Sequence, residues 1–181
     1  MEKMKRNIFL LIALLISFVS LFGCRGGNKS SSDHNLELHE DHFIIELELK
    51  VQKDDILGIY YRNKDEKYSK EQRILANVIG FKDYQKVMFV FDQLVFPSHI
   101  LIDFGENENQ GEILLRQLVF KYNDEEHVFS RQEIKKYFKP NSGFQFSFDS
   151  MAGKGVKVNG KYDPKLSSYN ISYFVNKLIL Y

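Results

Sequence analysis

The sequence predicts an all-β fold, an antiparallel β-sandwich of jelly-roll-like type with one short helix. Three observations predict this class. Apolar and polar residues alternate with a period of two over most of the body, which is typical of strands with one buried face. Turn-forming residues separate these runs, and strands do not alternate with long helices. We expect about seven or eight strands in two stacked sheets, with a barrel as the second choice.

The clearest strand covers residues 43–51. One face of it carries Phe43, Ile45, Leu47, Leu49 and Val51, and the other carries Glu46, Glu48 and Lys50. Such alternation predicts an antiparallel strand that is buried on one side only. Phe144, Phe146 and Phe148 alternate with polar residues in the same way and predict a second strand.

Less regular β-rich runs complete the sheets. They cover residues 56–61, 86–91, 99–104, 113–122 and 171–181. The run 72–79 is ambiguous, because Ser69 and Gln72 have the spacing of a helix capping box. Its apolar residues alternate, however, so we expect a strand there. Asn159-Gly160 is the strongest hairpin signal in the chain, since both residues tolerate a positive φ.

One helix is expected after Ser130. Ser130 and Glu133 have capping-box spacing, in which each side chain satisfies a free backbone N–H at the start of the helix. Pro140 limits the helix, because the residue before a proline disfavours helical geometry. The apolar side chains on one side of this helix are Ile134, Tyr137 and Phe138. We expect them to cover one end of the core.

The N-terminus has the composition of a secretory signal. Three basic residues within the first six precede the apolar run 8–16. A membrane-spanning helix needs about 20 apolar residues, and this run is shorter, so we expect residues 1–23 to be removed as a signal peptide.

The leader ends in Leu21-Phe22-Gly23-Cys24, which resembles the lipobox of bacterial lipoproteins. The resemblance implies cleavage before Cys24 and acylation of its thiol, so that the mature chain is anchored in a lipid bilayer. Cys24 is the only cysteine, and a lone cysteine in an exported protein has no internal disulfide partner. Lipidation accounts for it.

Residues 24–35 follow as the lipidated cysteine and a flexible tether rich in Gly and Ser. Arg25 is not the Asp that, in some bacteria, retains lipoproteins at the inner membrane. We therefore expect a lipid-anchored protein of the bacterial cell envelope, with the outer membrane favoured and either face possible. Residues 36–181 are long enough for one domain with a single core.

The charge balance argues against a nucleic-acid partner. The whole chain carries +1, and removal of the leader changes this to about −1. Such a chain has no basic excess with which to neutralise a phosphate backbone.

A second resemblance spans most of the mature chain. It depends on the order of the segments 55–61, 78–80, 87–91, 101–105, 137–141 and 162–164, together with Asn107 and Gln110. In this order the chain is similar to the β-sandwich accessory domains of bacterial cell-surface polysaccharide proteins. The resemblance implies a carbohydrate-related jelly roll and supplies no catalytic residue.

Oxygen-bearing side chains at the end of one strand are candidates for ligand binding. Asp103, Glu106 and Asn107 offer oxygens that suit sugar hydroxyls or Ca²⁺. The favoured alternative is that Asp103 and Asn107 hydrogen-bond the turn backbone.

Tyrosines form the second group of candidates. Tyr60, Tyr61 and Tyr162 could stack on sugar rings, because a tyrosine has an apolar body and a polar tip. The favoured alternative is packing in the core or on a sheet face. Asp163 follows Tyr162 within the polar stretch 151–170, which we expect to form a loop beside such a site.

No metal, cofactor or catalytic motif is expected. His39 and His42 would point to opposite faces of an extended segment, and His34 and His127 are expected to be solvated. No carboxylate pair lies in apolar surroundings that would raise one pKa, and no strained serine motif occurs.

Three functions are compatible with this sequence. The first is a membrane-tethered, non-catalytic module that binds a glycan or another envelope component through its loops. The second is a structural or assembly lipoprotein that docks an envelope protein at a sheet face or edge. The third, least supported, is a polysaccharide hydrolase, which would need two carboxylates brought together in a concave pocket.

Overall fold

The computed structural model describes residues 42–80 and 83–180. Sheet A consists of β1 (Ile44–Lys50), β4 (Gln85–Val90), β6 (Glu112–Tyr122), β7 (Glu125–Val128), β9 (Phe144–Ser147) and β10 (Ala152–Gly155). Sheet B consists of β2 (Asp55–Arg62), β3 (Arg73–Val78), β5 (His99–Asp103), β8 (Phe138–Pro140) and β13 (Lys165–Ser168). A separate hairpin joins β11 (Lys157–Val158) to β12 (Lys161–Tyr162), and the helices are α2 (Arg131–Tyr137) and α3 (Ser172–Ile179).

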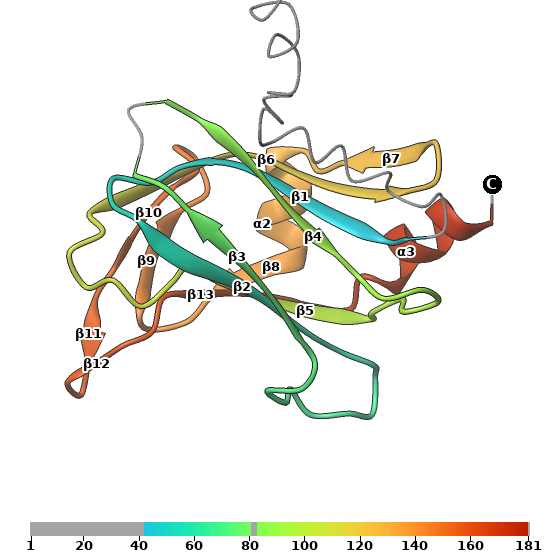
Figure 1. Ribbon diagram of the computed structural model, residues 1–181, viewed down its shortest axis with the longest axis horizontal. Coiled ribbons are helices and arrows are strands. Elements are labelled where there is room, and N and C mark those ends of the chain that lie inside the picture. The colour runs from blue at the N-terminus through green and yellow to red at the C-terminus, as the bar shows by residue number, and fades with distance from the viewer. Residues whose placement is uncertain (1–41, 81–82, 181) are drawn as a thin grey trace, which may run out of the picture. The chain divides into compact units, whose positions relative to one another are not determined.

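Both sheets are antiparallel and stack in a sandwich-like arrangement (Figure 1). The strand order of sheet A is β4-β1-β6-β10-β9, with β7 paired to β6, and that of sheet B is β3-β2-β5-β13-β8. The predicted all-β sandwich is therefore confirmed. The β11–β12 hairpin projects at one end of the sandwich, and α3 lies at the other (Figure 1).

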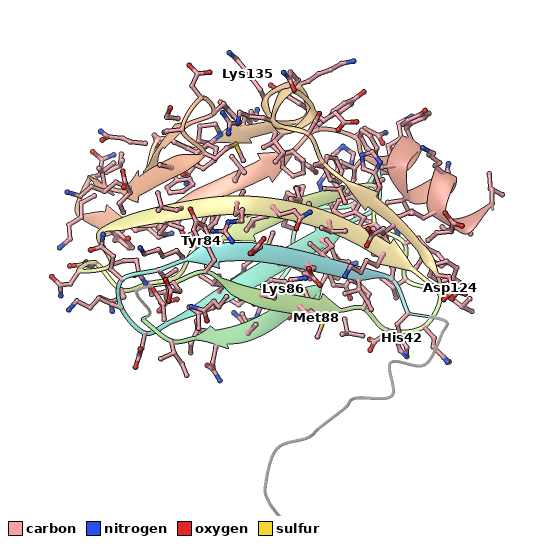
Figure 2. All side chains as sticks on the ribbon, turned by 90° about the horizontal axis from the view of Figure 1, so that it is seen from above. His42, Tyr84, Lys86, Met88, Asp124 and Lys135 are labelled. Carbon is pink, nitrogen blue, oxygen red and sulfur yellow. The ribbon has the colours of Figure 1, made fainter. Side chains whose placement is uncertain are left out.

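The core lies between the sheets and follows the predicted alternation. The fully buried side chains of β1 are Ile45, Leu47 and Leu49, and sheet B contributes Leu57, Ile59, Ile100, Ile102 and Leu166. Glu46 on the opposite face of β1 is also buried, which alternation alone does not explain. Its oxygens lie 3.0 Å from Lys86 Nζ and 2.8 Å from Lys121 Nζ, so the buried charge is paired. Figure 2 shows Lys86 on β4, beside β1.

A bulge explains why β6 has an irregular hydrophobic pattern. The register between β1 and β6 shifts between Glu48 and Leu49. The β6 residues that belong to the core cluster are Ile113, Leu115, Leu118 and Phe120, so the parity of the core-facing positions changes at the bulge. An extra residue in one strand reverses the inward and outward positions beyond it.

The turn and strand predictions around residues 72–79 and 159–160 are confirmed. β3 occupies the first segment, and Ser69 Oγ accepts a hydrogen bond from Gln72 N at 3.3 Å in the turn that precedes it. Asn159 and Gly160 have φ values of 51° and 78°, as a tight hairpin turn requires.

The predicted helix is confirmed as α2, with its capping box. Glu133 N donates to Ser130 Oγ at 3.2 Å, and Ser130 N donates to Glu133 Oε2 at 2.7 Å. Ile134 and Phe138 are buried at this end of the core, as expected.

The expected strand at residues 171–181 is wrong, because this segment forms helix α3. Phe174, Val175 and Leu178 are buried, and their spacing places them on one face of a helix. Within residues 42–80 and 83–180 there are thus two short helices rather than the one expected.

His127 is also placed differently from the expectation, because it is not solvated. Its ring centroid lies 4.7 Å from that of Phe129 and 4.6 Å from that of Phe174, and its side chain is 17% exposed. Nε2 lies 3.4 Å from Glu133 Oε1. Burial lowers the pKa of His127, and nearby Lys177 adds to this, while Glu133 opposes it.

No helix within residues 42–80 and 83–180 is long and apolar enough to span a membrane. The predicted signal peptide, Cys24, the tether, His34 and His39 lie outside the described residues.

Candidate functional site

An open pocket of about 650 Å³ lies on the outer face of sheet B. Its walls come from β2, β5, β13, the β2–β3 loop, the loop after β5 and the β11–β12 hairpin. The lining residues are Tyr60, Tyr68, Ser69, Lys70, Leu101, Asp103, Glu106, Glu108, Gly160, Lys161, Tyr162, Asp163 and Lys165.

Strand register determines the floor of this pocket. One row across β3, β2, β5 and β13 consists of Leu75, Gly58, Asp103 and Lys165. The next row consists of Arg73, Tyr60, Leu101 and Ser167. Neighbouring residues in a row face the same side of the sheet, so these side chains line one surface. Gly58 leaves the middle of the first row without a side chain.

Lys165 is the centre of an ion-pair cluster on this floor. Its Nζ lies 2.6 Å from Asp163 Oδ1 and 3.6 Å from Asp103 Oδ2. Lys161 Nζ lies 3.5 Å from Asp163 Oδ2. The cluster therefore places hydrogen-bond donors and acceptors side by side with little net charge.

The surroundings shift the pKa values of two of these groups. Burial raises the pKa of Asp103, while the Gly105 N–H and the Lys165 ammonium oppose that rise. Burial alone would lower the pKa of Lys165, but hydrogen bonding to Asp163 and the charge of Asp103 raise it overall. Lys165 therefore stays an ammonium donor at neutral pH.

Three tyrosines form the aromatic part of the pocket. Tyr60 Oη accepts a hydrogen bond from Arg73 Nη1 at 3.3 Å, and Lys165 Nζ lies 5.8 Å from the centre of its ring. Burial raises the pKa of both Tyr68 and Tyr162, so both hydroxyls stay protonated. Each therefore offers a ring surface and a neutral hydroxyl to a ligand.

Two glycines let the pocket walls approach the sheets. A Cβ at Gly155 would lie 2.3 Å from Tyr162 Oη, so only glycine leaves room for that ring. Gly105 has a φ of 99°, and a Cβ there would lie 2.3 Å from Asp55 Cγ. The Tyr162 ring of the hairpin thus packs closely on the backbone of Gly155, and the Asp55 carboxylate packs closely on the backbone of Gly105 in the loop after β5.

Asp55 holds the loop after β5, which carries Glu106 and Glu108. Its Oδ1 accepts from Glu106 N at 3.0 Å, and its Oδ2 accepts from Asn107 N at 3.2 Å. Its Oδ1 also accepts from Ile56 N at 2.9 Å. One carboxylate at the start of β2 therefore fixes the backbone of a pocket wall.

Gln110 completes this attachment from inside the protein, where it is fully buried. Its Oε1 accepts from Gln52 N at 2.9 Å and from Lys53 N at 2.8 Å. Its Nε2 donates to Lys53 O at 2.9 Å and to Asp55 Oδ2 at 3.1 Å. The loop is thereby tied to the turn between β1 and β2.

The structure brings five of the candidate residues together. These are Tyr60, Asp103, Glu106, Tyr162 and Asp163, and all of them line the pocket. The polar stretch 151–170 does border the site, but it contains strands β10 to β13 as well as loops.

Two candidate residues lie elsewhere. Tyr61 follows the opposite parity of β2, and its ring centroid lies 5.0 Å from that of Phe91 at the core. The favoured alternative, that Asp103 and Asn107 hydrogen-bond turn backbone, is confirmed for both residues, since Asp103 Oδ1 accepts from Gly105 N at 3.1 Å. Asn107 bonds backbone with both atoms of its amide. Its Nδ2 donates to Asp54 O at 3.0 Å, and its Oδ1 accepts from Asn109 N at 3.0 Å.

Sequence reasoning missed Lys165 and Tyr68. Lys165 had a usable signal, because it alternates with the buried Leu166 on a short strand and so had to face outward. Tyr68 lies in the β2–β3 loop, where no periodicity indicates which way a side chain points.

The described part of the chain contains no cluster of side chains that could ligate a metal ion. Within residues 42–80 and 83–180, no three His, Cys, Asp or Glu side chains are grouped so that they could hold an ion. His42 instead contacts the backbone, with Nδ1 2.5 Å from Phe91 O.

No family model matches this chain, and neither does any curated protein or solved structure. The similarities to the lipobox and to polysaccharide-associated domains therefore stay predictions. The pocket itself is the basis on which a function can be argued.

Proposed function

We propose that this protein is a non-catalytic binding module, tethered to the bacterial cell envelope, whose pocket on sheet B takes a carbohydrate. One observation carries the proposal. Three tyrosines and an ion-paired cluster of carboxylates and lysines line the same open pocket.

This combination suits the two surfaces of a sugar ring. The C–H face of a pyranose packs against an aromatic ring, and its hydroxyls exchange hydrogen bonds with charged side chains. Tyr60, Tyr68 and Tyr162 supply the rings, while Asp103 and Lys165 supply an acceptor and a donor. An apolar surface with a few placed polar groups is the general form of a small-molecule site.

The charge of the pocket favours a neutral ligand. Its cations are Lys70, Lys161 and Lys165, and its anions are Asp103, Glu106, Glu108 and Asp163. The two signs nearly balance, and Lys165 is already paired with two carboxylates. A nucleotide or another polyanion would need a surplus of unpaired cations. A neutral, polyhydroxylated ligand needs none.

The proposed localisation in the cell envelope depends on the predicted lipidation of Cys24. A lipid-anchored binding module outside the cytoplasm would meet polysaccharides of the cell surface or of the surroundings. The tether would let the pocket reorient over the membrane while the anchor keeps the protein in place.

Binding of the full chain to a panel of neutral polysaccharides, measured by isothermal titration calorimetry in detergent, tests the proposal. We expect at least one polysaccharide to bind, and Tyr162→Ala to weaken that binding roughly tenfold through lost stacking. The control is Tyr173→Ala on α3, where the side chain is 69% exposed and outside the pocket. Absence of binding across the panel, or an equal loss in both variants, would contradict the proposal.

Hydrolysis of the bound polysaccharide is the second candidate. The pocket does bring two carboxylates together, since Asp103 and Asp163 share Lys165, and burial raises the pKa of Asp103 as a general acid requires. Release of reducing ends that vanishes in Asp103→Asn, with binding retained, would support this candidate. Binding without release would exclude it for the polysaccharides tested.

A further inference from the structure

A second hollow of about 260 Å³ lies beside the pocket on the outer face of sheet B. It shares Tyr60, Asp103 and Glu106 with the first. Its remaining lining residues are Asp55, Ile56, Gly58, Arg73 and Leu75. The two hollows therefore meet along β2 and β5.

Gly58 lies at this junction and keeps it open. A Cβ at this position would lie 3.2 Å from Leu75 Cδ2, 3.5 Å from Tyr60 Cε2 and 3.6 Å from Asp103 Cβ. A larger side chain at residue 58 would thus occupy the space between the edge strand β3 and the ion-pair cluster. Because strand propensity disfavours glycine, the open floor is obtained at the expense of strand stability.

The second hollow differs in character from the first. Ile56 and Leu75 are 52% and 50% exposed, so they present aliphatic surface. Arg73 Nη1 is bonded to Tyr60 Oη, and the Asp55 carboxylate accepts backbone N–H groups of the loop. The hollow therefore offers an apolar floor with polar groups at its rim.

We propose that the two hollows form one groove, and that the ligand is an extended, neutral oligosaccharide whose adjacent sugar units lie on either side of Tyr60. This inference rests on the proposed carbohydrate function and names its ligand class. Successive units would pack their C–H faces on Tyr162, Tyr60 and Leu75 in turn. Sites of about 300–1,000 Å³ enclose ligands of drug size, which are larger than a single sugar, and the first hollow alone is within that range.

Chain-length dependence is the test. The full chain in detergent is titrated calorimetrically with three linear, neutral series of one to six units, the malto-, cello- and N-acetylated chito-oligosaccharides. For the series that binds, we expect affinity to rise with length by about tenfold or more between one unit and four. Equal affinity for one unit and for six would overturn the inference.

Substitutions at the junction separate this inference from the proposed function. Gly58→Val fills the junction and should reduce affinity for the six-unit ligand about tenfold, with little change for the shortest ligand that binds. Leu75→Ala should act in the same direction. Its matched control is Met88→Ala, since Met88 is 44% exposed on β4, which is an edge strand of the other sheet (Figure 2).

The outcomes are distinguishable. Binding that Tyr162→Ala weakens but Gly58→Val and Leu75→Ala leave unchanged at every length would overturn the extended groove and keep the carbohydrate pocket. Absence of binding for all three series and for the polysaccharide panel would overturn both. If Gly58→Val lowers the unfolding temperature sharply, Gly58→Ala replaces it, because its Cβ needs only a small shift of the flexible Leu75 side chain.

Discussion

Gln110 illustrates how a single buried amide supports a surface that lies several residues away. Its side chain makes four hydrogen bonds, all to Gln52, Lys53 and Asp55. Gln110 itself does not line the pocket. Its contribution is the position of the loop that carries Glu106 and Glu108.

Replacing this amide by an apolar side chain should be costly. Gln110→Leu leaves the backbone N–H groups of Gln52 and Lys53 without their acceptor, so we expect the free energy of unfolding to fall by about 1–3 kcal/mol. Chemical denaturation followed by circular dichroism measures this. Gln145→Leu on β9 is the control, because Gln145 is exposed and should change stability by less than about 0.5 kcal/mol. Equal stability of the two variants would disprove the role given to Gln110.

Single residues also show what sequence reasoning can reach within the site. Parity along β2 separates Tyr60, which faces the pocket, from Tyr61, which packs on Phe91. That parity is readable from the buried Leu57 and Ile59, so the distinction could have been made. Gln110 was not predictable as a buried hub, because its partners lie more than fifty residues earlier in the chain.

At the scale of elements, local signals predicted local structure. The capping box before α2 and the Asn159-Gly160 turn act over a few residues, and both are found as expected. The segment 171–181 contains several aromatic and β-branched residues, which favours a strand, yet residues 172–179 form helix α3. The spacing of Phe174, Val175 and Leu178 carried the helical period, and no side-chain cap marks its start.

Helix α3 packs against His127, which makes its attachment sensitive to pH. Burial between Phe129 and Phe174 lowers the pKa of His127 below its ordinary 6.5, so the folded chain binds this proton less tightly than the unfolded chain. Stability from this group is complete above pH 6.5 and is lost as the pH falls from there toward the folded pKa. Glu133 from α2 and Lys177 from α3 are the charged groups that act on it.

We therefore expect the free energy of unfolding to decline as the pH falls below about 6.5, and His127→Phe to remove part of that decline. Denaturant unfolding at a series of pH values measures the slope. Burial also lowers the pKa of His99, so the double variant with His99→Gln should flatten the slope further. An unchanged slope in His127→Phe would show that His127 is not responsible.

For the molecule as a whole, period-two alternation and turn residues were sufficient to predict two antiparallel sheets. Alternation decides which face of a strand is buried, and that requirement acts on every strand at once. The pocket was harder to predict from the sequence, because its lining residues come from β2, β5, β13 and three connecting segments. Their meeting depends on strand order, which a hydrophobic pattern does not specify.

Membrane localisation through Cys24 is a prediction about the whole molecule. Cys24→Ala should move the protein expressed in its host from the membrane fraction to the soluble fraction, because acyl chains contribute about 0.8 kcal/mol per buried methylene. Fractionation with immunoblotting, and intact mass of the N-terminal peptide, measure the outcome. Ser32→Ala in the tether is the control and should leave the protein with the membranes. Retention of Cys24→Ala in the membrane fraction, or a native Cys24 without acyl chains, would refute the anchor.

The network of Asp55 and Gln110 has a consequence for the thermodynamics of recognition. Because these two side chains already hold the wall of Glu106 and Glu108 in place, that wall is preorganised, and little conformational entropy remains to be lost on association. Complex formation would then show a modest entropic penalty and a fast, nearly rigid-body encounter. Discrimination between ligands would then depend on a surface whose shape is already set before the ligand arrives.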